Sequence, residues 1–516
     1  MKINNKIIVV LTLLLATVTS CHSDLDTVPL STLSPENFFN NVEESELAVN
    51  GVYDGLTPHY QQHYIKMSDH GSHVSTSVLL TNFNQNLYAF YSLDNSDVGL
   101  KTTWATAYTT IYRANTVISR VEMLESDDPV KNRIIAEAKF LRALSYFNLV
   151  RFFGDVPLIL EELVDFSDVN KPRVASRLIY DAIIDDLQYA EQNLYHASWV
   201  ADDNHPSYGS GELGRATIGA AKGLLSKVYL TMASYPLRET AFYQLAYNKA
   251  DEVISEGHYQ LDSEYTNLFT YEGESSHEWM FQIQYVAVEE QGSQWGGVHN
   301  APGNSQAASR GFGRMSPTMK FTNSYDQNDP RFLHNIAKGT LKPDGSVQYK
   351  KSSRKWYCYK YRFSTQPIGR FQTDMNAPVL RYGDILLVFA EAANELGLDS
   401  DAHDALDLLL ARAQAGGTSP ALVDRNLMSV DLKEFIFWER GRELCFEGGS
   451  KFDIVRAGSD KFIEEVKGQE ETLDETNPSR TQEVDWSDNV QSYHVLMPIP
   501  EAEMSANTSM TQNPGY

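Results

Sequence analysis

The sequence predicts a mainly α-helical protein, in which packed helix pairs form a scaffold that two loop-rich segments interrupt. Three observations lead to this fold class. Apolar residues recur at the helical period of 3.6 residues in several segments, glycines follow these segments, and two stretches without such a period are rich in Gly, Asn, Ser and aromatic residues. With 516 residues, 42% of them hydrophobic, the chain is long enough to bury one large core or two adjoining ones.

The helical period is clearest in the middle and in the last third of the chain. It predicts amphipathic helices over 179–194, 218–232, 242–253, 385–396 and 402–413. Gly257, Gly397 and Gly416 follow three of these segments, and glycine is common where a helix ends. Small residues on the packing faces, such as Ala221 and Gly223, allow close approach of helices. We therefore predict a scaffold like that of tetratricopeptide repeats (TPR), although the period is not a regular 34 residues.

Segment 134–153 differs from these helices because it is apolar on more than one face, which predicts a central, buried helix that ends at Gly154. Four charged residues interrupt it, and buried charges need partners. We expect these side chains to pair with other helices. They are Glu137, Lys139, Arg142 and Arg151.

The loop-rich segments are 59–101 and 261–379. The second contains a turn signal at Lys342-Pro-Asp-Gly345, followed by tyrosines that alternate with other residues from Tyr357 to Tyr361. This pattern predicts a small amount of β structure. Long loops on a rigid scaffold often carry the binding residues of a protein, so we expect the ligand there.

The first residues predict export and a lipid anchor. Lys2 and Lys6 precede an apolar run over 7–18 that is too short to span a bilayer, which is typical of a signal peptide over 1–20. Cys21 then resembles the lipidated cysteine of bacterial lipoproteins; the alternative is an ordinary signal peptide with a cysteine near its cleavage site. The acidic tether after Cys21 favours display on the cell exterior.

Charge and cysteine usage exclude several classes. The net charge of −25 argues against nucleic acid as a partner but leaves neutral ligands unaffected. Only Cys358 and Cys445 follow Cys21, so disulfides are not the framework of this protein, and Cys445 is predicted to be a small buried residue. No spacing typical of metal ligands occurs, and we expect neither a metal nor a cofactor.

Two motifs resemble catalytic or nucleotide-binding patterns, but their sequence context favours a structural role. The glycine spacing over 209–214 resembles a nucleotide fingerprint, but a polar segment precedes it instead of an apolar strand, so we interpret it as an approach to a helix. Glu439, Glu443 and Glu447 share one helix face, and the arginines nearby favour an ion network over catalytic carboxylates. A glycosidase pair elsewhere stays an alternative, because acidic residues are abundant.

Several motifs, in the right order and over nearly the whole chain, resemble the SusD/RagB family of outer-membrane lipoproteins. They are the tether 21–29, Asn50-Gly51-Val52-Tyr53, Glu137-Ala138-Lys139-Phe140-Leu141-Arg142-Ala143, Phe153-Gly154-Asp155-Val156-Pro157, Leu380-Arg381-Tyr382-Gly383-Asp384, Trp438-Glu439-Arg440 and Asn513-Pro514-Gly515-Tyr516. The chain departs from the family after Gly448, where the basic residue expected two positions on is missing, which puts one local ion pair in question.

The resemblance implies a single domain over 21–516, with about four TPR-like helix pairs mainly in 30–58, 102–260 and 380–516. It implies a non-enzymatic lipoprotein that captures an oligosaccharide and delivers it to a SusC-type TonB-dependent transporter of the outer membrane. Two alternatives are the same architecture binding peptides and a surface glycoside hydrolase. A TPR adaptor that binds only protein is a third.

Ligand residues were chosen by context, because sugar rings stack on aromatic faces and sugar hydroxyls bind amides and carboxylates. The first loop supplies Asp69, Asn82, Phe83 and Asn84. The second supplies Trp295 and Phe312, each flanked by glycines, which we expect to expose the ring.

Overall fold

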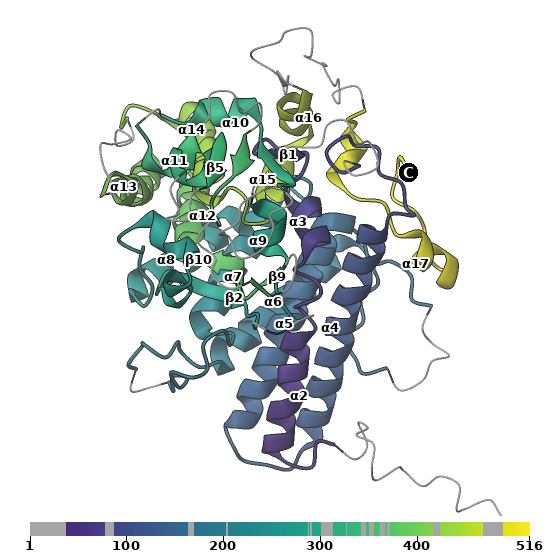
Figure 1. Ribbon diagram of the computed structural model, residues 1–516. Coiled ribbons are helices and arrows are strands. Elements are labelled where there is room, and N and C mark those ends of the chain that lie inside the picture. The colour runs from purple at the N-terminus through teal and green to yellow at the C-terminus, as the bar shows by residue number, and fades with distance from the viewer. Residues whose placement is uncertain are drawn as a thin grey trace, which may run out of the picture.

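The computed structural model describes residues 38–77, 87–163, 170–202, 205–286, 288, 291–300, 313–326, 328–341, 347–349, 356–361, 367–368, 372–415, 424–467 and 489–516. The fold is mainly α-helical, as predicted (Figure 1). The longer helices are α2 (Val42–Asp54), α4 (Val98–Met123), α5 (Val130–Phe153), α6 (Ser176–Asn193), α7 (Ile218–Ala233), α8 (Phe242–Glu256), α12 (Tyr382–Glu395), α13 (Asp399–Ala415) and α14 (Ser429–Leu444).

Shorter elements connect these helices. The short helices are α3 (Gln62–Asp69), α9 (Trp295–His299), α10 (Met319–Ser324), α11 (Pro330–Asn335), α15 (Ser450–Arg456), α16 (Ser459–Lys467) and α17 (Glu501–Ala506), with 3-10 turns η3 (Tyr265–Phe269), η4 (Glu272–Ser275) and η7 (Ser492–Val495). The strands are β1 (Ser75–Ser77), β2 (Trp279–Ile283), β3 (Met315–Pro317), β4 (Ile336–Ala337), β5 (Gly339–Leu341), β6 (Val347–Tyr349), β7 (Tyr357–Cys358), β8 (Pro367–Ile368), β9 (Gln372–Thr373) and β10 (Ala377–Arg381).

The long helices pack against one another in chain order. α4 packs on α5, α5 on α6, α6 on α7 and α7 on α8, while α2 lies along α4 and α5 (Figure 1). The order then continues from α8 to α12, and α12 contacts both α13 and α14. This arrangement is the predicted scaffold of helix pairs, because each helix buries its apolar face against the helices before and after it.

Three of the glycines predicted to end helices do so, whereas Gly416 lies outside the described residues. Gly257, Gly154 and Gly397 follow α8, α5 and α12 with φ of +65°, +71° and +75°. A residue with a side chain adopts this left-handed conformation at a cost, so the glycines mark where these helices stop.

Helix α5 is buried on nearly all sides, as predicted, and most of its charges have partners on other elements. Arg142 Nε donates to Asp186 Oδ2 of α6 at 2.8 Å, and Glu137 Oε2 accepts from Arg215 Nη1 at 2.8 Å. Arg151 is different, since its guanidinium lies between aromatic rings, 3.8 Å and 3.9 Å from the ring centres of Phe147 and Phe452.

The loop-rich segments contain more short helices than their sequence predicted, including α3, α9, α10 and α11. Their strands form antiparallel pairs only: β1 with β3, β2 with β10, β4 with β7, β5 with β6, and β8 with β9. The β5–β6 pair confirms the predicted hairpin, with Leu341 opposite Val347 across the turn. Among the described residues, the alternation that begins at Tyr357 yields a two-residue strand, and Cys358, Tyr359, Lys360 and Tyr361 are all buried instead of alternating between core and solvent.

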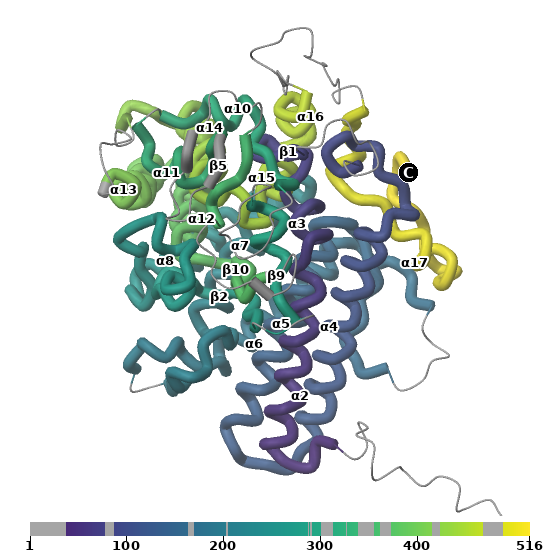
Figure 2. Tube along the Cα trace, viewed as in Figure 1, coloured from purple at the N-terminus to yellow at the C-terminus, as the bar shows by residue number. Residues whose placement is uncertain are grey.

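One apolar core cluster contains residues from Val49 to Met510 and includes Cys445, which is fully buried as predicted. The C-terminal segment lies beside α4 (Figure 2), and α17 contacts α4. Asn513 Nδ2 donates to the carbonyls of Phe153 at 2.9 Å and Met497 at 2.7 Å. The last residues of the chain therefore close the scaffold over the end of α5.

Candidate ligand-binding site

The two loops predicted to hold the ligand leave the scaffold from one strand pair. β1 lies directly before segment 78–86, and β3 follows segment 301–312 after two residues. Ser77 lies opposite Met315 in the ladder, and Thr318 Oγ1 donates to the carbonyl of His73 at 2.7 Å. The ends of the two predicted loops are thus held side by side, although they are far apart in the sequence.

Four of the predicted ligand residues, Asn82, Phe83, Asn84 and Phe312, lie outside the described residues, as does Cys21. The structure therefore shows the base from which their loops start and places none of these side chains. Their contact with a ligand stays a prediction.

Asp69, the fifth predicted residue, is the last residue of α3 and is fully buried. Its carboxylate accepts hydrogen bonds from the Gly448 N–H at 3.1 Å, from the Ser450 N–H at 3.2 Å and from the Ser450 hydroxyl at 2.5 Å. Burial raises the pKa of Asp69 to about 6, although these hydrogen bonds act in the opposite direction. Asp69 holds the turn after α14 in place and presents no surface to a ligand.

Trp295, the sixth, begins α9 and is also fully buried, so the expectation of an exposed ring is wrong at this position. Its glycine neighbours, Gly296 and Gly297, are buried inside α9 as well. The ring packs against Tyr361, with 6.1 Å between centroids, and its Cη2 atom lies 3.4 Å from the point that a Cβ at Gly448 would occupy. Asp69 and Trp295 therefore meet at Gly448, behind the base of the loops rather than on their surface.

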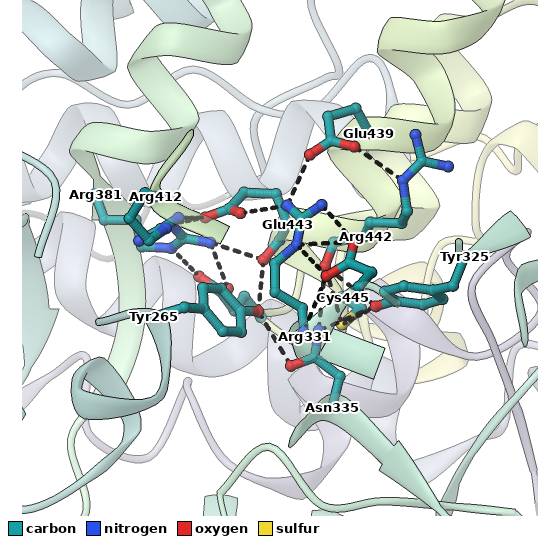
Figure 3. Close-up of polar contacts among 12 residues, drawn as sticks. Tyr265, Tyr325, Arg331, Asn335, Arg381, Arg412, Glu439, Arg442, Glu443 and Cys445 are labelled. Atoms are coloured by element: carbon teal, nitrogen blue, oxygen red, sulfur yellow. Dashed lines mark hydrogen bonds and ion pairs between the residues drawn. The ribbon is translucent and has the colours of Figure 1, made fainter. Parts of the chain in front are cut away.

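A buried group of charges, which we call the α14 ion cluster, lies at the same end of α14. Figure 3 shows the convergence of its side chains. Arg381 Nη1 lies 2.7 Å from both Glu443 Oε1 and Glu278 Oε1, and Arg331 Nη1 lies 2.9 Å from Glu443 Oε2. The cluster balances five carboxylates against five cations. They are Glu278, Asp329, Glu439, Glu443 and Glu447, with Arg331, Lys360, Arg381, Arg412 and Arg442.

Electrostatics explains why the cluster tolerates burial. Burial alone would raise the pKa of Glu443, but its ion pairs with Arg412, Arg381 and Arg331 hold that pKa well below its usual range. Glu447, which lies beyond the end of α14, pairs with Arg381 at 2.8 Å and with Lys360 at 2.5 Å. The basic residue missing after Gly448 is therefore replaced by cations from other elements.

The ion network predicted for Glu439, Glu443 and Glu447 is confirmed, but the predicted shared helix face is wrong for Glu447, because α14 ends at Leu444. Glu439 and Glu443 are fully buried, and all three carboxylates are paired with cations. A catalytic carboxylate must reach its substrate, so the burial of Glu439 and Glu443 argues against a catalytic role for them. Their role is to join β10, α11 and α13 to α14.

A cavity of about 420 Å³ lies where β2 meets the connection between α6 and α7. Much of its lining, from Tyr271 to Gln284 and at Asn376, belongs to segment 261–379, which was predicted to hold the ligand, but none of the predicted site residues lines it. Segment 209–214, the glycine-rich approach to α7, lies along one side of it. Aromatic and polar side chains share its walls. They include Trp199, Glu212, Tyr271, Glu274, Gln282, Gln284 and Asn376. The glycine-rich segment 209–214 is the sequence feature that could have indicated this cavity. Because a polar segment precedes it, the sequence alone indicates only an approach to a helix.

Two negative findings apply to the described residues. No group of three or more His, Cys, Asp and Glu side chains among them could hold a metal ion. In the same residues, no helix combines the length and the apolar character needed to cross a membrane.

Comparison with known proteins defines the class to which this fold belongs. Residues 25–230 match a family described as "Starch-binding associating with outer membrane", and residues 340–516 match the SusD family. The chain belongs to the SusD/RagB family, as its motifs indicated.

Relatives match over the full length of the chain. A SusD-like protein of Formosa agariphila is 27% identical over 98% of both chains, and a second from the same organism is 26% identical over 100% of both. The crystal structure of a SusD homolog from Bacteroides thetaiotaomicron superimposes with a TM-score of 0.80 at 24% identity, covering 93% of this chain and 98% of that one. A laminarin-binding SusD-like protein gives a TM-score of 0.69 at 22% identity, with coverages of 92% and 99%.

Proposed function

We propose that this protein is a surface lipoprotein of the outer membrane that captures an oligosaccharide and delivers it to a SusC-type TonB-dependent transporter. The match of residues 25–230 to the starch-binding family carries the ligand part of the proposal. Two proteins with the same fold support it, one described as laminarin binding and one crystallised with a xylogluco-oligosaccharide. No catalytic step is part of the proposed function.

The proposed glycan site is the face from which the two loops leave the β1–β3 pair. Phe83 and Phe312 would supply rings for stacking, and Asn82 and Asn84 would supply amides for hydroxyl groups. Asp69 and Trp295 are assigned a different role in this proposal. Because both are buried around Gly448, they would keep the loop bases in place without touching the sugar.

Glycan binding is tested with the mature protein from Ser23, titrated calorimetrically with a panel of neutral and acidic oligosaccharides. We expect at least one neutral oligosaccharide to bind, and Phe83→Ala and Phe312→Ala to weaken it several-fold each, since each removes one stacking ring. Tyr112→Ala is the matched control, because Tyr112 is a 43% exposed aromatic residue on α4, away from these loops. Binding of peptides with no binding of any glycan would overturn the proposal.

The lipid anchor and the partner are tested in cells. Wild-type protein should be found in the outer membrane, accessible to protease from outside and co-purifying with a TonB-dependent transporter. Cys21→Ser should release it as a soluble product, because two or more acyl chains are needed for stable anchoring. An unchanged location of the Cys21→Ser protein would refute lipidation at this residue.

A further inference from the structure

The cavity at β2 is built from several segments that the fold brings together, including Asn376 from the segment before β10. Met280, Phe281 and Gln282 of β2 line it, together with the connection between α6 and α7 and the turn η4. No residue of β1, β3 or α9 is among the residues that line it. The cavity is therefore separate from the β1–β3 pair, although part of its lining belongs to the predicted loop-rich segment 261–379.

Among the aromatic rings that line this cavity, Trp199 is held in a fixed orientation. Trp199 is held by a hydrogen bond of 2.9 Å from its Nε1 to the carbonyl of His258, and it stacks on His277 with 4.5 Å between ring centres and 9° between planes. Tyr271 also lines the cavity and is 55% exposed. Flat rings that need no reordering favour binding of a ring-shaped ligand, since less conformational entropy is lost.

Polar side chains in the cavity wall are held by one another and keep free hydrogen-bonding groups. The Asn376 N–H donates to Glu274 Oε1 at 2.8 Å, and Asn376 Nδ2 donates to Gln284 Oε1 at 3.0 Å. Gln282 Nε2 donates to the carbonyl of Glu274 at 3.0 Å. Within the described part of the chain, Glu274 Oε2, Gln282 Oε1 and Gln284 Nε2 make no hydrogen bond, so an acid, an acceptor and a donor remain for a ligand.

The charges around the cavity select against anions. Glu212, Glu272 and Glu274 line it, and the guanidinium of Arg215 is the cation in this lining. That guanidinium is already paired with Glu46 at 2.8 Å, Glu137 at 2.8 Å and Glu212 at 3.2 Å. A carboxylated or sulfated sugar would meet carboxylates without a free cation, whereas a neutral sugar would meet only hydrogen-bonding groups.

We infer that this cavity is a second sugar site, which takes one or two rings of an uncharged glycan and excludes acidic ones. Its volume lies at the lower end of the range of about 300–1,000 Å³ that is typical of small-ligand pockets, which favours a short segment over a long chain. The inference rests on the proposed function, because it deepens the assignment of a glycan to this protein.

The test uses the mature protein, titrated with neutral di- to tetrasaccharides and with oligogalacturonides of equal length. We expect neutral sugars to bind and oligogalacturonides not to bind. Tyr271→Ala and Glu274→Gln should each weaken neutral-sugar binding at least about five-fold, as expected for loss of one stacking ring or one charge-assisted hydrogen bond. Tyr112→Ala, which removes another exposed ring, should leave it unchanged.

The outcomes separate this inference from the proposed function. Neutral-sugar binding that is lost in Phe83→Ala and Phe312→Ala but unchanged in Tyr271→Ala and Glu274→Gln would overturn the second site alone. Oligogalacturonide binding that depends on Tyr271 would overturn its selectivity. No binding of any glycan would overturn the proposed function, and the second site with it. Far-ultraviolet circular dichroism of each variant confirms that the fold is intact.

Discussion

The α14 ion cluster and the cavity at β2 are both rich in glutamates, but the pKa of Glu443 in the cluster and the pKa of Glu274 at the cavity are shifted in opposite directions. Burial acts to raise the pKa of Glu443 and of Glu274 alike. In the ion cluster three arginines reverse its effect, and the pKa of Glu443 lies well below the usual value. At the cavity no cation of the described segments pairs with Glu274, and burial raises the pKa of this side chain to about 7.

This difference shows how the same residue type serves two purposes. A carboxylate whose charges are balanced on every side joins segments of the fold, as Glu443 joins β10, α11 and α13 to α14. A carboxylate with one oxygen unpartnered at a hollow can still accept a hydrogen bond from a ligand. A shifted pKa of a carboxylate is therefore informative about function only when the groups that pair with this carboxylate are known.

The largest expected effect is that of Glu443→Gln. The substitution keeps the side-chain size but leaves the buried cluster with one uncompensated positive charge. We expect the free energy of unfolding at pH 7 to fall by about 3–5 kcal/mol, as is usual when one member of a buried ion pair is removed. Urea denaturation monitored by circular dichroism measures it.

Glu464→Gln on α16 is the control, because Glu464 is exposed, and we expect it to be neutral. The pH dependence gives a second check. Since the pKa of Glu443 is lowered in the folded protein, its contribution is complete above the unfolded value of about 4.3 and is lost as pH falls towards the folded value. Equal stability of Glu443→Gln and wild type at pH 7 would contradict the role given to the cluster.

An intermediate effect is expected for Gly448→Ala, which tests how tightly the buried region around Gly448, next to the α14 ion cluster, is packed. Gly448 has a φ of +79°, and an added Cβ would lie 3.1 Å from Tyr64 Cε1. Backbone strain and this contact should together cost about 1–3 kcal/mol in unfolding free energy. Gly449→Ala is the matched control, because nothing lies within 4 Å of its Cβ and its φ is −130°. A loss as large in the control would refute the argument from packing.

The smallest effect is expected for Glu274→Gln and develops as pH rises from about 4.3 to about 7. Because the folded pKa of Glu274 is raised to about 7, folding favours its protonated form, and stability is lost as pH rises from the unfolded value through 7. The variant removes this loss, so we expect it to be more stable than wild type at pH 8. Because Glu274 is partly exposed and solvent screens its charge, we expect a difference of about 1 kcal/mol at pH 8 and a smaller one at pH 5. Thermal unfolding at both values measures it.

Glu272→Gln, an exposed neighbour on the same turn, should show no such pH dependence. If the stability of Glu274→Gln and of wild type changes in parallel between pH 5 and 8, the pKa of Glu274 is not raised by folding. The contrast between the cavity and the α14 ion cluster is then contradicted.

The sequence was sufficient for the helical scaffold and for the ion network. The period of residues such as Ile179, Ile183 and Leu187 identified α6, and Gly257 marked the end of α8. It was not sufficient for the candidate site. The glycines beside Trp295 suggested exposure, but the ring is covered by Tyr361, which approaches from a distant segment.

What the sequence determined by itself are features that depend on neighbours along the chain, such as helix positions and helix ends. The tertiary structure decided the pairing of β1 with β3, the burial of Asp69 and Trp295, and the ionisation of Glu443 and Glu274. The physical reason is that helical periodicity depends on residues only three or four positions apart in the sequence. Burial and charge pairing, in contrast, depend on side chains from several distant elements, and only folding brings these together.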